Sequence, residues 1–135
     1  MRNLLGNTAA AEFEPAFCEL CGAVGQTLTS LGIFPNLKGY AVLKDAVLIR
    51  IQGFYDGKTD SLYEQLAALH DCEPKTVEGN IRSAIRAAAN SGMLMRINDL
   101  IGAQVVDEPY CHLSSMQFIA LLAHYFIYNF LPNDI

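Results

Sequence analysis

The chain has 135 residues, of which 52% are hydrophobic and 17% charged, and this size and composition predict one folded domain rather than a disordered chain. Nine Lys and Arg against fourteen Asp and Glu give a net charge of −5, which excludes a uniformly basic nucleic-acid-binding domain but allows a locally basic surface. The sequence contains no apolar run long enough to span a membrane and no secretory signal pattern, so we expect a cytoplasmic protein without a membrane partner.

Apolar residues recur every three or four positions along most of the chain, and this period predicts an all-α fold. We expect residues 1–11 to form a loose lead-in and residues 12–135 to form a single domain. The predicted helices span Glu12–Leu31, Leu37–Gln52, Ser61–His70, Pro74–Asn90, Ile97–Ile101 and Ser115–Phe130. In the second of these, Val47, Ile49 and Ile51 alternate as they would in a strand. The length of the segment favours a helix.

Several helix ends carry recognisable signals. The motifs Ser61-x-x-Glu64 and Ser114-x-x-Gln117 predict capping boxes at the starts of the third and last helices. Pro74 suits the first turn of the fourth helix, where its missing N–H costs nothing, and Ser91-Gly92 suits its end. Between the second and third helices, the stretch 53–58 contains Asp-Gly and predicts a turn.

The third and fourth predicted helices, separated by a short break, have the outline of a helix-turn-helix. The fourth has an apolar stripe for the core and an opposite face that suits a major groove, because Arg and Asn can pair with base edges. An ordinary solvent-exposed face with a Glu78–Arg82 ion pair is the alternative. The residues that we expect to contact DNA are Lys75, Glu78, Gly79, Asn80, Arg82, Ser83 and Arg86.

Five short runs give the chain a family resemblance. They are Leu31 to Tyr40, Val77 to Ile85, Ser91-Gly92, Leu100-Ile101-Gly102 and Phe118-Ile119-Ala120. In this order and spacing they resemble the C-terminal effector domain of the stage-zero sporulation master regulator, over nearly the whole chain. The resemblance implies a six-helix bundle whose fourth helix recognises a short promoter box in double-stranded DNA. It also implies binding as tandem dimers that activate or repress sporulation genes.

Carried over to this sequence, the resemblance places Glu78 and Arg82 at groove-facing positions and Lys75 at a polar contact at the helix start. The chain departs from the family pattern at Gly79 and Ser83, where Arg and His are usual. The loop before the last helix is acidic at Asp107-Glu108, whereas the family has a basic loop. Lost base and phosphate contacts would weaken binding and change the sequence read. The chain is also too short to include the regulator's receiver domain.

These departures support a second hypothesis, a protein-interaction or dimerisation module on the same fold with weakened or lost DNA binding. The last helix is unusually aromatic, and its apolar residues fall on most sides. Packing within the bundle would explain this pattern as well. We expect Phe118, Tyr125 and Tyr128 to form a partner or homodimer interface.

The cysteine and histidine residues of the chain argue against catalysis and metal binding. Cys18-x-x-Cys21 lies within a predicted helix and has no second pair, while Cys72 and Cys111 are isolated. His70, His112 and His124 have no nucleophile or carboxylate in a shared motif, and the sequence contains no glycine-rich phosphate loop. We therefore expect a protein that is not an enzyme, with no cofactor, no metal and no small-molecule substrate.

Overall fold

The computed structural model describes residues 10–57, 61–107 and 113–129, and the prediction of an all-α fold is confirmed. No strand occurs in these three ranges. Helices run in chain order as α1 (Ala10–Ser30), α2 (Lys38–Asp56), α3 (Leu62–His70), α4 (Pro74–Asn90), the 3₁₀ turn η1 (Met93–Met95), α5 (Arg96–Ile101) and α6 (Ser115–Asn129).

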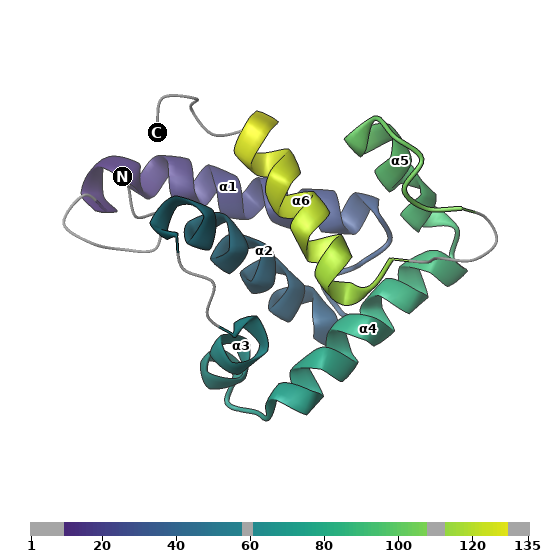
Figure 1. Ribbon diagram of the computed structural model, residues 1–135, viewed down its shortest axis with the longest axis horizontal. Helices are drawn as coiled ribbons and strands as arrows, with labels where there is room; N and C mark the ends of the chain where they lie inside the picture. The colour runs from purple at the N-terminus through teal and green to yellow at the C-terminus, as the bar shows by residue number, and fades with distance from the viewer. Residues whose placement is uncertain (1–9, 58–60, 108–112, 130–135) are drawn as a thin grey trace.

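The α2 helix is the centre of the molecule and packs against α1, α3, α4 and α6 (Figure 1). Its apolar residues point in several directions, as expected for a helix enclosed by others. Six of them are buried: Val42, Leu43, Ala46, Val47, Leu48 and Ile51. The alternating residues Val47 and Ile51 therefore belong to a helix, as predicted from the length of the segment.

The core combines side chains from every helix around α2. Its largest fully buried members include Phe118 and Phe126 of α6, Leu20 and Leu28 of α1, and Leu66 of α3. Each such side chain stabilises the fold by about 1.5–3 kcal/mol relative to an exposed one. Together they fix the positions of the helices.

Two boundaries differ from the sequence-based expectation by more than one residue. The α1 helix begins at Ala10, inside the predicted lead-in. The α2 helix continues through Gly53, where a turn was predicted, and ends at Gly57. A single glycine costs a helix interior only about 1 kcal/mol, whereas Gly57 has φ +72 and its N–H donates to the Gly53 carbonyl at 2.8 Å. The left-handed residue, rather than the first glycine, ends the helix.

The two predicted capping boxes have opposite outcomes. At α6, the Gln117 N–H donates to the Ser114 Oγ at 3.1 Å and the Ser114 N–H donates to the Gln117 Oε1 at 2.8 Å, which confirms the box. At α3, the Ser61 side chain makes no capping hydrogen bond, so that prediction is wrong. None of the helices in the described ranges is both long enough and apolar enough to cross a membrane.

Candidate nucleic-acid interface

The helix pair α3 and α4 is joined by three residues, Asp71, Cys72 and Glu73. Asp71 has φ +53, a left-handed conformation that Asp tolerates better than most residues. The Asp71 and Cys72 N–H groups both donate to the Ala67 carbonyl, which closes α3. Pro74 then starts α4 at its first turn. The predicted helix-turn-helix is thus present in the connection as well as in the helices.

A polar contact holds the end of α3 against the central helix. His70 Nε2 lies 2.8 Å from Asp45 Oδ2 of α2, and both side chains are partly buried. This contact joins residues 25 positions apart and sits one residue before the turn. It therefore orients α3, against which α4 packs.

The inner side of α4 is the apolar stripe that its sequence predicts. Five residues, Val77, Ile81, Ala84, Ile85 and Ala88, are buried. They pack against α2 and α3, and at one point the backbones of α2 and α4 come very close. Gly39 in the first turn of α2 lies against the Asn80 carbonyl of α4. The inner side is fully used by the core, so only the outer side is available to a ligand.

The outer side of α4 carries all seven residues predicted to contact DNA, at different degrees of exposure. Lys75, Arg82, Ser83 and Arg86 are exposed, whereas Glu78, Gly79 and Asn80 are half-buried. Asn80 lies at the edge of this face, because its backbone is the part that meets Gly39. The others line up along the helix at intervals of three and four, as one face requires.

Glu78 and Arg82 form the predicted i,i+4 ion pair, with 3.1 Å between Arg82 Nη1 and Glu78 Oε1. The Arg82 side chain is 55% exposed and the Glu78 side chain 45% exposed. The pair is therefore weak by itself, and a ligand can compete for the guanidinium. It also means that the positive charge of Arg82 is partly balanced in the free protein.

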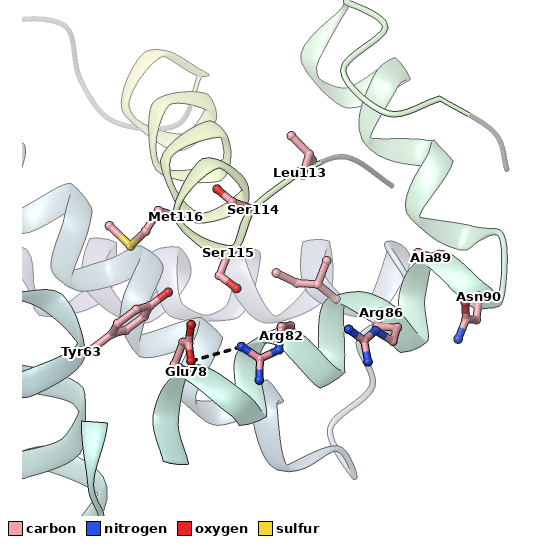
Figure 2. A pocket seen from close by; sticks show the side chains of 11 residues that line it. Tyr63, Glu78, Arg82, Arg86, Ala89, Asn90, Leu113, Ser114, Ser115 and Met116 are labelled. Atoms are coloured by element: carbon pink, nitrogen blue, oxygen red, sulfur yellow. Dashed lines mark ion pairs between the residues drawn. The ribbon is translucent and has the colours of Figure 1, made fainter. Parts of the chain in front are cut away.

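A pocket of about 560 Å³ opens between α4 and the first turn of α6 (Figure 2). One wall is the row of α4 side chains that includes the predicted DNA contacts Glu78, Arg82 and Arg86. The other wall comes from the segment that starts α6, and Tyr63 of α3 closes one end. The remaining lining residues are Ile85, Ala89, Asn90, Leu113, Ser114, Ser115 and Met116.

Tyr63 joins α3 to the start of α6 within this pocket. Burial raises the pKa of the Tyr63 hydroxyl above its usual value, and a side-chain hydrogen bond with Ser115 opposes part of that rise. The hydroxyl is therefore neutral at physiological pH. Sequence patterns did not reveal Tyr63, Ser115 or Met116 as pocket residues, because only the packing of α3 and α6 against α4 brings them together.

The first part of the segment between α5 and α6 is held by the side chain of Asn98, which no sequence pattern singled out. The Asn98 Oδ1 accepts hydrogen bonds from the Val105 and Val106 N–H groups at 2.7 and 2.9 Å, and its Nδ2 donates to the Val106 carbonyl at 2.9 Å. Asp107 is exposed and its Oδ1 accepts a hydrogen bond from Gln104. Glu108, the second acidic residue of this loop, lies outside the described residues.

The residues predicted for a partner interface do not share one environment. Phe118 is fully buried in the core, so this prediction needs correction: its side chain packs against the other helices and has no surface to offer a partner. Tyr125 is half-buried. Tyr128 is 65% exposed and its ring centroid lies 5.7 Å from that of His124.

The cysteines of the described residues are free thiols. Cys18 is exposed, while Cys21 and Cys72 are half-buried. Cys111 and His112 lie outside the described ranges. Within those ranges, no three His, Cys, Asp or Glu side chains are grouped closely enough to hold a metal ion.

Sequence comparison agrees with this geometry. The family described as "Sporulation initiation factor Spo0A C terminal" matches residues 24–126. The matched range begins within α1 and ends within α6, so it includes the whole α3–α4 unit and the pocket beside it. No curated protein matches the sequence.

Proposed function

This chain belongs to the family of the C-terminal domain of the sporulation initiation factor Spo0A, and from that membership we propose a sequence-specific transcriptional regulator that inserts α4 into the major groove of DNA. The family is one of DNA-binding regulatory domains rather than of enzymes. A target on chromosomal DNA would require a cytoplasmic location, which we propose together with the function.

The outer face of α4 is the observation that carries this proposal. Three cationic side chains, Lys75, Arg82 and Arg86, are exposed on it while the inner face is occupied by the core. A major groove is wide enough for one α-helix. Three cations on a single exposed helix face supply a local attraction to phosphate in a chain whose net charge is −5.

Glu78 and Arg82 are the residues that we assign to base recognition. An arginine can donate two hydrogen bonds to a guanine edge, and a glutamate can accept one from the amino group of cytosine. Their ion pair in the free protein holds both side chains on the outer face. Gly79 and Ser83 are small, so the helix can approach the bases closely.

Titration against DNA tests the proposal directly. Purified protein is added to a labelled duplex that carries the promoter box of the family, and in parallel to a scrambled duplex, at two salt concentrations. We expect tighter binding to the box and weaker binding at the higher salt concentration, because phosphate contacts release counterions. Equal binding to both duplexes would contradict sequence-specific recognition.

A second candidate function is a protein-interaction module that has weakened or lost DNA binding. Specific observations favour it: Glu78 already balances Arg82, Asp107 is exposed in the loop before α6, and the chain is acidic. Absence of binding to either duplex at low salt would support this module and contradict the DNA reader.

We also propose that the exposed part of α6 forms a homodimer contact. Tyr128 is 65% exposed and stands beside His124, and the helix carries no Asp, Glu, Lys or Arg. An acidic chain can approach a second copy there without like-charge repulsion. Sedimentation velocity over a range of concentrations should show a dimer that Tyr128→Ser weakens. A chain that stays monomeric at high concentration would contradict this contact.

A further inference from the structure

The pocket beside α4 has features that reading DNA does not require. Its lining includes four apolar side chains, Ile85, Ala89, Leu113 and Met116. Ile85 is buried, and the other three are partly exposed. Base edges and phosphates are mainly polar, so a helix that reads them needs contacts at its outer rim rather than a cavity with apolar walls. The apolar part of this pocket suits a different occupant.

Charge is distributed unevenly along the pocket. At one end Glu78 pairs with Arg82, close to Tyr63, so that end carries a balanced pair. Towards the other end lie Arg86 and Asn90 (Figure 2). No described residue forms an ion pair or hydrogen bond with the Arg86 side chain. Among the described residues, Arg86 thus has no ionic partner, and it lies next to an apolar surface.

We propose that this pocket binds an organic anion with an apolar ring, with its anionic group on Arg86 and its ring against Ile85, Ala89 and Leu113. A volume of about 560 Å³ is in the usual range for pockets that bind small molecules, which combine apolar walls with few polar groups. A guanidinium binds a planar carboxylate through two parallel hydrogen bonds. A neutral ligand of the same shape would leave this cation unused.

Occupation of the pocket has a consequence for the proposed function. Arg82 and Arg86 line the pocket and also belong to the face assigned to DNA. A bound anion would take Arg86 and place negative charge beside Arg82, so it should compete with DNA. This competition rests on the proposed function, whereas binding of the anion does not.

Direct binding is tested with a matched pair of probes, naphthalene-2-carboxylate and naphthalene-2-carboxamide. The two share ring and shape and differ in charge. Two-dimensional ¹H–¹⁵N NMR of the full chain should show shifts at Ala89, Ser115 and Met116 for both probes, with the carboxylate bound about five- to tenfold more tightly. Equal affinity for the two probes, shifts confined to another region, or no binding of either would overturn the proposal.

Two substitutions locate the charge effect. Arg86→Gln keeps a polar but shorter side chain and removes its charge, and it should abolish the preference for the carboxylate. Lys75→Gln removes the same charge from α4 at an exposed position outside the pocket lining, and it should leave that preference intact. An equal effect of the two substitutions would show that the carboxylate responds to the overall positive charge of α4 and not to a binding site at Arg86.

A separate experiment measures whether the carboxylate displaces DNA. If the labelled duplex binds, the carboxylate should release it at concentrations that fill the pocket in the NMR titration, and the carboxamide should release much less. If the duplex does not bind, the DNA-reader proposal fails while the NMR titration still decides whether the anion site exists. Binding of both the carboxylate and DNA to the same molecule would overturn the competition.

Discussion

The backbone of Asn80 in α4 lies directly against Gly39 in α2, so closely that no side chain fits at position 39. An ideal Cβ at Gly39 would lie 2.7 Å from the Cβ of Ala84 and nearer still to the Asn80 carbonyl oxygen. Real Cβ atoms essentially never approach other atoms within 3.0 Å. Gly39 therefore sets the spacing of the two helices and the height at which the outer face of α4 stands above the core.

Gly39→Ala should lower the free energy of unfolding by about 1–3 kcal/mol, the usual cost of overpacking. The atoms in the way belong to backbone and to a short side chain, which cannot rotate aside. Urea denaturation measures the change. Gly79→Ala is the matched control, since nothing lies within 4 Å of its Cβ position, and it should raise stability by about 0.5–1 kcal/mol. Equal stability of the two variants would contradict this account.

Arg82→Ala should weaken specific DNA binding by about 1–3 kcal/mol, the contribution of a bidentate contact to a base. The same change should also reduce discrimination between the box and a scrambled duplex. Fluorescence anisotropy with both duplexes measures the two effects. Arg96→Ala removes the same charge from α5, where the side chain donates to the Ser30 carbonyl, and it should affect both duplexes alike. Unchanged affinity of the Arg82 variant would remove this residue from the interface.

Ser114→Ala should lower the free energy of unfolding by about 1 kcal/mol, because it removes the acceptor of the Gln117 N–H at the start of α6. The pocket wall begins at the same turn, so local amide exchange there should also increase. Thermal denaturation and hydrogen exchange measure these two effects. Ser83→Ala, on the exposed face of α4, serves as the control and should leave stability nearly unchanged. A similar loss in both variants would speak against the capping role.

The Asp45–His70 contact should contribute about 0.5–1 kcal/mol of coupling free energy, as partly exposed polar pairs do. A double-mutant cycle with Asp45→Ala, His70→Ala and the double variant measures it by urea denaturation. Because the pair orients α3 next to the turn, the single variants should also show altered NMR shifts in residues 71–73. Additive single effects, with no coupling, would show that the contact does not hold α3.

The thiols of α1 should differ in their reaction with iodoacetamide. Burial raises the pKa of the Cys21 thiol; Lys44 opposes this effect, and Cys18 and Asp45 add to it. A raised pKa means a smaller thiolate fraction at any given pH, so Cys21 needs a higher pH to react. Cys18 is exposed and should be alkylated first at pH 7. Mass spectrometry of peptides measures both rates, and faster alkylation of Cys21 would contradict this order.

The sequence predicted the elements of the fold well where the signal is local. Pro74 and Ser91-Gly92 gave the range of α4 to the residue, and the motif Ser114-x-x-Gln117 identified the cap of α6. The sequence-based predictions failed where two local signals compete. Gly53 resembled a turn but is accommodated inside α2, and Ser61 resembled a cap but makes no capping hydrogen bond.

The residues on the outer face of α4 could be chosen from the sequence because one amphipathic helix reveals its own outer side. The buried position of Phe118 could not be predicted from the sequence, since α6 is apolar on most sides and its sequence does not say which side faces the core. The sequence did not predict the pocket either. Its two walls come from segments about thirty residues apart, and no periodicity links Arg86 to Leu113 or Ser115.

By itself, then, the sequence determined the helical fold and the polar face of α4, because these follow from the spacing of side chains along a helix. The family followed from the resemblance of particular sequence runs and from the family match over residues 24–126. Only the tertiary structure decided how that face is presented. The contact of Gly39 with Asn80, the hydrogen-bonding contact of Asp45 with His70 and the start of α6 beside α4 arise between distant segments. Such contacts depend on how side-chain volumes fill a shared core, and that packing leaves no regular pattern in the chain.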